Sequence, residues 1–403
     1  MLDMKQVKEV EQSVLKTFQT ELPSVYYSDK TEKEYKQFKE NAIYMYHDLF
    51  KFPPDMFRGK KLIDFGAGTG ESTVYLAEWG AKCTLVEMND IALNIAKEVF
   101  QKYTNNYEDH NFFLSSIFDY NNSSEKYDIV RASGVLSHTA AKEQAFSKIA
   151  TYIKPGGYFI YGDPNKSGGF QNMLQRYIIY KFSQDWESMV QTSEYLFKYD
   201  IDRSQSFVNR TRRAIIFDRW VVQKQDDPSV KEVLQWLDNN NLILYSAYPP
   251  ITFPVFGDSV HHQPKYYAQS FKDIGTFVEA IWLMQNESDS VEIPKILSPL
   301  SEIAKSQSAL VDYFSNTSQA TVIENDEAKL KVDNYIDSFK NADITSYILS
   351  KIKLFMNEVK DVLDLIERND IHQVKNYISK TKLLFRGATG VRHVDFIAYK
   401  KNN

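Results

Sequence analysis

The sequence predicts an α/β protein in which helices cover both faces of a parallel sheet and further helical segments are added to this core. Two observations predict this class. Between residues 58 and 165, short apolar runs alternate with stretches of helical periodicity, the pattern of parallel strands joined by crossover helices. The chain of 403 residues is also longer than one such core requires, and residues 252–391 have mostly helical patterns.

Residues 1–57 are expected to form an N-terminal helical segment. Val10, Val14 and Phe18 recur at four-residue intervals, so they would lie on one buried face of a helix. Pro23 ends this pattern, and a second amphipathic stretch follows before the next pair of prolines.

Residues 58–165 are expected to form the sheet and its connecting helices. The predicted strands are Lys61–Phe65, Cys83–Glu87, Asn111–Ser115, Tyr127–Ala132 and Tyr158–Gly162. The helices predicted between them are Glu71–Trp79, Ile91–Tyr103 and Ala140–Ile153. The loops that follow parallel strands lie at one edge of the sheet, so residues at the strand ends are the first candidates for a binding site.

The rest of the chain is predicted to divide into four segments. They are a helical insertion or lid at 166–228, a return to the core at 229–251, a helical segment for substrate binding or oligomerisation at 252–391, and a terminal core strand at 392–403. The return contains a predicted strand at Leu242–Ala247, and His393–Lys400 alternates like a strand. If that last strand joins the first sheet, the long helical segment before it is an insertion. A homodimer through this segment is one prediction for its role.

Charge and cysteine content exclude several classes of protein. The 53 Asp and Glu residues outnumber the 48 Lys and Arg residues, and the net charge of −5 disfavours a protein built to bind nucleic-acid phosphates. Cys83 is the only cysteine, and no cluster of Cys and His indicates a metal site. The first residues lack the apolar run of a signal peptide, and no stretch of about 18 apolar residues suggests a membrane span. We therefore expect a cytoplasmic protein without a bound metal.

The strongest motif is a glycine-rich loop between the first predicted strand and the first predicted helix. Gly66, Gly68 and Gly70 alternate with other residues, and Asp64 stands two positions before the first glycine. Glycine lets the chain turn sharply and lets a ligand lie against bare backbone. The compact spacing differs from the G-x-G-x-x-G motif of dinucleotide-binding loops and favours a nucleoside that carries an amino-acid tail.

Glu87 ends the second predicted strand and is the next polar candidate after the glycine loop. A carboxylate at this place can accept hydrogen bonds from both hydroxyls of a ribose. The succession of strand, glycine loop, helix, strand and terminal acid therefore predicts a nucleoside-binding site.

With these motifs the sequence resembles the class I S-adenosylmethionine-dependent methyltransferases, which have a Rossmann-like core. The resemblance covers roughly residues 58–165. The stretch Asp64–Gly70 is similar to the first motif of that family and Glu87 to its ribose-binding acid. Lys154–Gly157 resembles the turn before the fifth strand, and Gly134–Thr139 resembles the loop after the fourth strand in ubiquinone-biosynthesis-type enzymes.

The resemblance implies S-adenosylmethionine as cofactor and S-adenosylhomocysteine as its product. Gly66 and Gly68 would face the methionine part, and Glu87 the ribose. Ser116 and the residue after it would flank the adenine, with Asp119 as the alternative partner of the adenine amino group. The full set of implied cofactor-binding residues is Asp64, Gly66, Ala67, Gly68, Gly70, Glu87, Met88, Ser116, Ile117 and Ser133.

Two residues are predicted to act on the acceptor. Methyl transfer from a sulfonium is an in-line displacement, which depends on positioning and exclusion of water and needs a base only for a protonated acceptor. His138, after the fourth strand, is the predicted base, and its alternative role is to hold its own loop. Asp163, at the end of the fifth strand, is predicted to contact the acceptor, and its alternative role is a turn before proline.

Three further groups have both a functional and a structural interpretation. His261 and His262 would either cover the site or be solvated in a proline-flanked loop. A cluster of arginines would either bind a carboxylate or phosphate of the substrate or form a solvated helix face. Its members are Arg203, Arg210, Arg212, Arg213 and Arg219. An aromatic stripe would either pack in the added helices or line the acceptor pocket. Its members are Tyr177, Tyr180, Phe182, Trp186, Tyr195 and Phe197.

The favoured function is methylation of an oxygen or nitrogen of a small molecule, such as a secondary metabolite, a sugar or a lipid-like acceptor. One alternative is an RNA- or protein-modifying methyltransferase whose basic face would combine the arginines with Lys166, Lys181 and Lys198. A second alternative is an inactive scaffold with a methyltransferase fold. The acidic balance makes nucleic acid an unlikely partner and favours a small-molecule acceptor.

Overall fold

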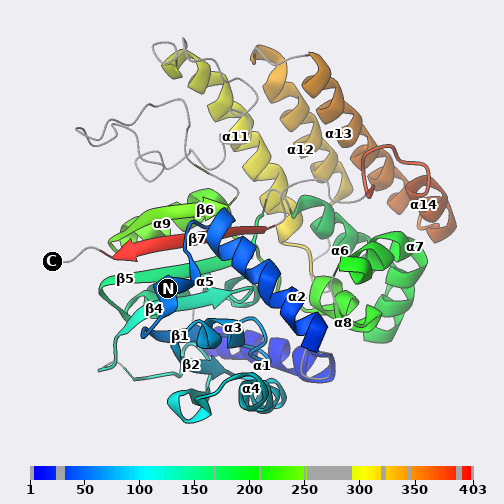
Figure 1. Ribbon diagram of the computed structural model, residues 1–403. Helices are drawn as coiled ribbons and strands as arrows, with labels where there is room; N and C mark the ends of the chain where they lie inside the picture. Colours follow the sequence, from blue (N-terminus) through cyan, green and yellow to red (C-terminus); the bar gives the residue numbers. More distant parts are fainter. Residues whose placement is uncertain are drawn as a thin grey trace.

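The computed structural model describes residues 4–23, 32–122, 124–166, 169–207, 210–248, 251, 293–318, 324–342, 346–386 and 393–400. A seven-stranded sheet forms the centre of the molecule, and a group of long helices rises from one end of it (Figure 1). The strands are β1 Lys61–Phe65, β2 Lys82–Glu87, β3 Asn111–Leu114, β4 Tyr127–Ser133, β5 Ile153–Pro164, β6 Leu242–Tyr248 and β7 His393–Lys400.

The strand order is β3-β2-β1-β4-β5-β7-β6, and the first five strands are parallel. Strand β7 runs antiparallel between β5 and β6. The last described strand therefore belongs to the same sheet as the first five. The chain between β6 and β7 leaves the sheet and comes back to it, while the division of the whole chain into segments stays a prediction.

The described helices cover both faces of the sheet and build the added group. Around the sheet they are α1 Met4–Thr20, α2 Glu32–Ile43, α3 Val74–Glu78, α4 Asp90–Tyr103, α5 Lys142–Ala150 and α9 Val230–Asn239. The added helices are α6 Phe170–Phe182, α7 Trp186–Phe207, α8 Arg212–Ile216, α11 Ile293–Ser315, α12 Asn325–Ser338, α13 Ser346–Glu367 and α14 Ile371–Ile378. The short turns are η1 Tyr44–Leu49, η2 Pro54–Phe57, η3 Tyr107–Asp109, η4 Leu136–His138, η5 Phe217–Val221 and η8 Phe339–Asn341.

Alternation along the strands explains the two cores beside the sheet. Ile63 and Phe65 of β1 point to one face, where they are buried with Phe146 of α5 and Trp236 of α9. Leu62 points to the other face and is buried with residues of α3, α4 and η1. Each face of a parallel sheet must be covered in this way, which is why its strands are continuous apolar runs.

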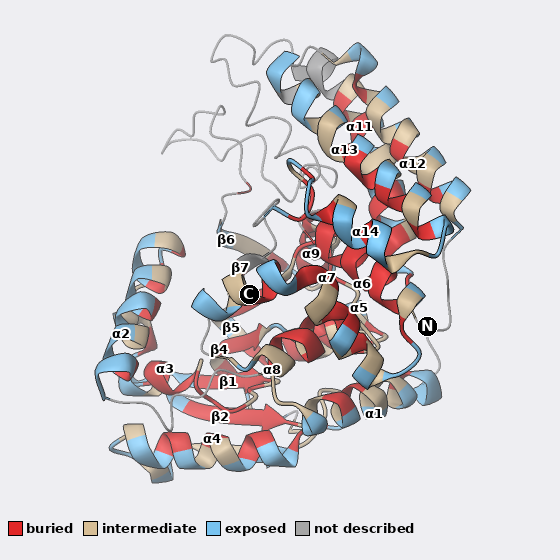
Figure 2. Cartoon of the chain, turned by 90° about the vertical axis from the view of Figure 1, so that its right-hand side faces the viewer, coloured by how far each residue is buried: buried red, intermediate tan, exposed pale blue. Residues whose placement is uncertain are grey.

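A third core is formed by the added helices that precede β6 in the sequence together with those that follow it. Phe170 of α6 packs edge-on against Phe314 of α11, with ring centroids 5.1 Å apart. The Tyr177 hydroxyl donates to Asn325 Oδ1 at 2.6 Å. Figure 2 shows the buried side of these helices facing inward and their exposed side facing outward. The two helical additions therefore pack as one group, and the aromatic stripe belongs mainly to this core.

The largest differences between observed and predicted element boundaries lie at α3, α5 and β5. The helix predicted from Glu71 begins at Val74, because the preceding residues form turns after the glycine loop. Helix α5 ends at Ala150, three residues early, and β5 already begins at Ile153. The turn predicted at Lys154–Gly157 is part of β5, where the pairing between β4 and β5 is irregular.

Candidate active site

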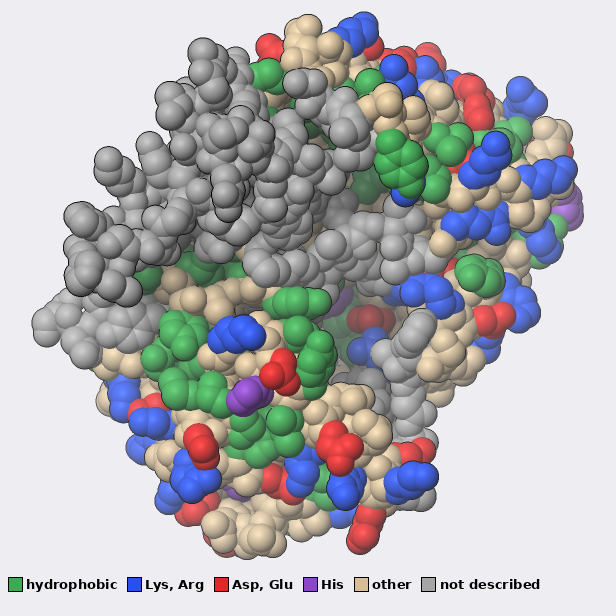
Figure 3. All heavy atoms as spheres, turned by 45° about the horizontal axis from the view of Figure 1, so that its top comes forward, with side chains coloured by type: hydrophobic (Ala, Val, Ile, Leu, Met, Phe, Trp, Pro, Cys, Tyr) green, Lys and Arg blue, Asp and Glu red, His purple; other side chains and the backbone are tan. Residues whose placement is uncertain are grey.

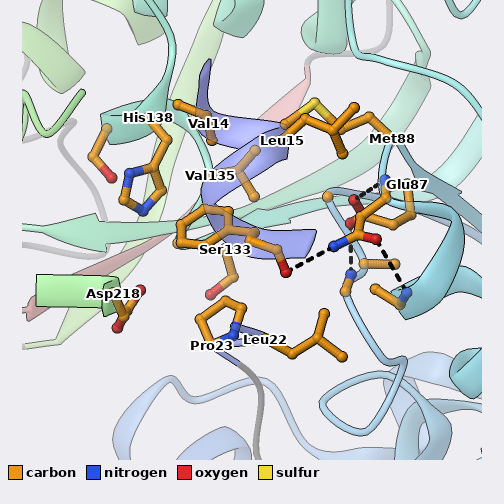
Figure 4. A pocket seen from close by; sticks show the side chains of 18 of the residues that line it. Val14, Leu15, Leu22, Pro23, Glu87, Met88, Ser133, Val135, His138 and Asp218 are labelled. Atoms are coloured by element: carbon orange, nitrogen blue, oxygen red, sulfur yellow. Dashed lines mark hydrogen bonds between the residues drawn. The ribbon is translucent and has the colours of Figure 1, made fainter. Parts of the chain in front are cut away.

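A cavity of about 530 Å³ lies at the carboxyl ends of the parallel strands (Figure 4). The order of the strands reverses between β1 and β4, and ligands of open α/β sheets bind outside such a switch point. Loops after four strands, helix α1 and residues of the first helical addition form its walls.

The glycine loop forms one wall of the cavity. Gly66, Ala67 and Gly68 line it, and both glycines have a positive φ, of 68° and 54°. A Cβ at position 66 would lie 2.5 Å from Val135 Cγ2, closer than two carbons approach. The loop after β1 and the loop after β4 therefore meet only because position 66 is glycine.

Glu87 is held beside this loop by the backbone. Its Oε2 accepts from the N–H of Gly68 and its Oε1 from the N–H of Asn89, both at 2.8 Å (Figure 4). Burial raises the pKa of Glu87, and these N–H groups oppose the rise by stabilising the charged form. The carboxylate thus stands at the cavity wall in a fixed orientation.

Most of the other predicted cofactor residues also line the cavity. They are Met88, Ser116, Ile117 and Ser133. The Ser116 hydroxyl lies 3.3 Å from Lys8 Nζ and donates to Asp119 Oδ2 at 3.1 Å. Asp119 does not line the cavity, and its side chain is mostly exposed beside Lys8. Of the two candidates for the adenine end, Ser116 is the one at the wall.

Asp64 and Gly70, the other two predicted cofactor residues, do not line the cavity. Asp64 alternates to the α3 face of β1, where it is fully buried, accepts from Arg131 Nη1 at 2.6 Å and binds the Thr73 hydroxyl. A Cβ on Gly70 would lie 3.0 Å from Ala96 Cβ, so this glycine allows α4 to pack closely. Both residues therefore support the glycine loop from the side that faces away from the cavity.

His138, in the short turn η4 that follows β4, also lines the cavity. Its Nδ1 lies 2.9 Å from the carbonyl oxygen of Lys224. A carbonyl can only accept, so Nδ1 carries the proton and Nε2 of the neutral ring keeps a lone pair. Phe18 of α1 packs at 84° to the imidazole, with centroids 5.2 Å apart.

Asp163, predicted to contact the acceptor, lies behind the loop after β4. Asp163 is buried and does not line the cavity. Its carboxylate accepts from the Tyr161 hydroxyl at 2.6 Å, the Ser137 hydroxyl at 3.1 Å and the N–H of Leu136 at 3.2 Å. Because β5 lies next to β4, the carboxylate reaches under the neighbouring loop and positions the turn that carries His138.

Helix α1 contributes functional residues that the sequence pattern did not reveal. Its apolar face covers the cavity, together with the residues just after it. The lining residues from this segment are Glu11, Val14, Leu15, Phe18, Leu22 and Pro23. Asn89 Nδ2 donates to the carbonyl oxygen of Phe18 at 3.2 Å, which ties the helix to the loop after β2. An apolar stripe indicates burial but does not say whether the stripe covers a core or a ligand.

The first helical addition supplies the remaining wall. These lining residues are Asn172, Arg210, Asp218, Arg219 and Gln225. Two of the five clustered arginines thus reach the cavity. Arg212 instead pairs with Glu194 and Asp202, and Arg213 with Glu187. None of the aromatic stripe lines the cavity, and His261 and His262 lie outside the described residues.

No helix within the described ranges is long and apolar enough to cross a membrane. No group of three or more His, Cys, Asp or Glu side chains within the same ranges could hold a metal ion.

Comparisons with known proteins connect this geometry to a family. Residues 38–211 match the family model described as "Methyltransferase domain". Ubiquinone biosynthesis O-methyltransferase of Coxiella burnetii is 26% identical over 110 residues, which cover 27% of this chain and 46% of that protein. The protein of the same name from Alkalilimnicola ehrlichii is 24% identical over 144 residues, or 34% and 57% of the two chains. The chain therefore spans about half the length of the curated relatives it matches.

Matches to solved structures have lower sequence identity. Magnesium protoporphyrin IX methyltransferase from Synechocystis, solved with bound S-adenosylmethionine, is 17% identical, with a TM-score of 0.28. The match covers 40% of this chain and 76% of that one. The YcgJ protein of Bacillus subtilis is 13% identical, with a TM-score of 0.31 and coverage of 54% and 72%.

Proposed function

The chain carries a class I S-adenosylmethionine-dependent methyltransferase domain, and from this premise we propose that it transfers a methyl group to an oxygen or nitrogen of a small-molecule acceptor. The observation that carries the proposal is the Glu87 carboxylate, held by Gly68 N–H at the wall of the cavity. It has the charge and the position to accept hydrogen bonds from the two ribose hydroxyls of a nucleoside.

The residues at this end of the cavity fit S-adenosylmethionine. Ser116 and Ile117 would flank the adenine at the end of β3, and Glu87 would bind the ribose at the end of β2. Gly66 and Gly68 would lie against the methionine part at the end of β1, where a side chain at position 66 would clash with Val135. When bound, the cofactor supplies a methyl group on a positively charged sulfur.

The chain's own residues would then position the acceptor and remove its proton. Helix α1 covers the cavity with Val14, Leu15 and Phe18, so it would exclude water from the reacting atoms. His138 Nε2 is the proton acceptor of this wall, because Nδ1 is committed to the Lys224 carbonyl. Asp163 would act through the loop it holds, as a positioning residue.

Two observations support a small acceptor over RNA or protein. The cavity has a volume of about 530 Å³ and α1 forms part of its wall, which suits a small ligand beside the cofactor. Two lysines of the alternative docking face are engaged in ion pairs: Lys166 pairs with Asp312 at 2.9 Å and Lys198 with Asp202 at 2.6 Å. On the face drawn in Figure 3, basic and acidic side chains are interspersed and do not gather into one basic surface.

A size-resolved labelling experiment tests the proposal. The purified protein is incubated with S-adenosylmethionine tritiated on the methyl group and a cell extract. Dialysis separates macromolecules from small molecules, and chromatography then separates the labelled small molecules from the unreacted cofactor. We expect label in a small compound other than the cofactor, and we expect His138→Gln to slow its appearance while leaving cofactor binding intact. Transfer of label only to RNA or protein would contradict the small-molecule acceptor, and label that stays wholly in the cofactor would support the scaffold.

A further inference from the structure

The end of the cavity away from Glu87 is lined by buried polar side chains from the first helical addition. Asn172 of α6 and Arg219 of η5 are both more than nine-tenths buried. Arg210 and Asp218 also line the cavity, as does His138. In Figure 4, Asp218 and His138 lie on one side of the cavity and Glu87 on the other.

The charged residues of this end carry an excess of positive charge. Arg210 Nη1 donates to Asp218 Oδ2 at 2.9 Å. Asp200 faces two guanidinium groups, Arg203 Nη2 at 3.2 Å and Arg219 Nη1 at 3.5 Å. Burial alone would raise the pKa of Asp200, but Arg219 and its other partners outweigh it and lower the pKa. Three guanidinium groups thus share two carboxylates.

Buried polar atoms without a hydrogen-bond partner among the described residues occur at this end. Those of interest are Asn172 Oδ1, an acceptor, and Arg210 Nε, a donor, because both residues line the cavity. A buried polar atom without a partner is costly, so such atoms point to a ligand that satisfies them. Asn172 Oδ1 can accept a hydrogen bond from a hydroxyl or amine of a ligand, and Arg210 Nε can donate one to an anionic group.

We propose that this end of the cavity binds a small acceptor with one carboxylate, which Arg210 and Arg219 hold, and a hydroxyl or amine that donates to Asn172. The inference rests on the proposed methyl transfer and names the class of its acceptor. A planar carboxylate matches the forked donors of a guanidinium, and its single charge matches the single excess positive charge. A phosphate monoester would bring a second negative charge that this cluster does not balance.

Calorimetric titration of the full-length protein, first saturated with S-adenosylhomocysteine, tests this class. The probes are salicylate, its neutral analogue salicylamide, and phenyl phosphate. We expect saturable binding of salicylate, with salicylamide and phenyl phosphate at least about tenfold weaker, since a charge-assisted hydrogen bond is lost or a charge is left unbalanced. Equal binding of salicylamide, tighter binding of phenyl phosphate, or no saturable binding of salicylate would overturn the proposal.

Matched arginine variants locate the effect. Arg210→Gln should weaken salicylate about tenfold and leave salicylamide unchanged. Arg219→Lys keeps the charge of a buried residue while losing its fork, and should weaken salicylate less than Arg210→Gln does. Arg212→Gln, in the same cluster but paired with Glu194 outside the cavity wall, should have no effect.

The first titration also separates the two proposals. A protein that does not bind S-adenosylhomocysteine at all contradicts the proposed function. Binding of S-adenosylhomocysteine without binding of salicylate would contradict only the carboxylate-bearing acceptor. An equal loss of salicylate affinity in Arg210→Gln and Arg212→Gln would contradict it as well.

Discussion

At the scale of single residues, Glu87 links burial to cofactor binding. Its carboxylate must be ionised to accept hydrogen bonds from a ribose, yet burial raises its pKa above the usual value for glutamate. We therefore expect the affinity for S-adenosylhomocysteine to be highest above that pKa and to fall as the pH is lowered through it. Calorimetric titration over a pH series measures this, with Glu87→Gln as the reference that cannot titrate. An identical acid-side loss of affinity in Glu87→Gln would assign the dependence to another group.

Gly70 lies in the glycine loop, but we expect its substitution to change the stability of the protein and not its affinity for the cofactor. Its φ is 71°, and an added Cβ would lie 3.0 Å from Ala96 Cβ. Gly70→Ala should therefore lower the free energy of unfolding by about 1–2 kcal/mol, through backbone strain and crowding. Because the residue does not line the cavity, the folded variant should bind S-adenosylhomocysteine as the natural protein does. Thermal unfolding measures the change in stability, and calorimetric titration of the same sample measures the affinity for S-adenosylhomocysteine. A large loss of affinity would show that Gly70 takes part in cofactor binding.

The sequence predicted the residues at the cavity wall better than the contacts of the residues behind it. Glu87, Gly66 and Gly68 are recognisable because their spacing from strand ends is set by local geometry. The roles of Asp64 and Asp163 depend on which neighbour each carboxylate reaches, Arg131 in β4 and Ser137 in the loop after it. Such partners are distant in the sequence, so a motif at the strand end does not reveal them.

At the scale of elements, α1 is the part whose position matters most for function. Its Phe18 ring contacts His138, and its backbone accepts from Asn89, so the helix touches both ends of the cavity. We expect Phe18→Ala to weaken S-adenosylhomocysteine binding by about 1 kcal/mol, roughly fivefold in Kd, chiefly by faster dissociation. Stopped-flow displacement measures the rate. Phe113→Ala, at an exposed position of β3 outside the cavity wall, is the control and should leave the rate unchanged.

The strands were more predictable than the placement of the helices. Lys61–Phe65 and His393–Lys400 have the predicted bounds, because apolar alternation and flanking breakers act within a few residues. The joining of α6 with α11 depends on contacts such as Tyr177 with Asn325, far apart in the sequence. No local pattern contains that information, so the common core of the two additions could not be predicted.

At the scale of the whole molecule, β7 ties the last part of the described chain to the sheet. Phe396 is 3% exposed and stacks on Tyr161, its cross-strand partner in β5, with ring centroids 6.0 Å apart. Phe396→Ala should destabilise the protein by about 3 kcal/mol, the usual cost of removing a buried phenyl ring. The midpoint of thermal unfolding measures the effect. Leu330→Ala on the exposed side of α12 is the control, and an equal shift in both variants would contradict the structural role of β7.

The most direct test of the whole account is calorimetric titration with S-adenosylmethionine and S-adenosylhomocysteine, with NAD as the comparison ligand. The account predicts micromolar binding of the first two and none of NAD, and a loss of about 1.5–3 kcal/mol of binding free energy in Glu87→Ala, the scale of a charged hydrogen bond. Binding of NAD, or unchanged affinity in a folded Glu87→Ala variant, would contradict the assignment of this cavity as the cofactor site.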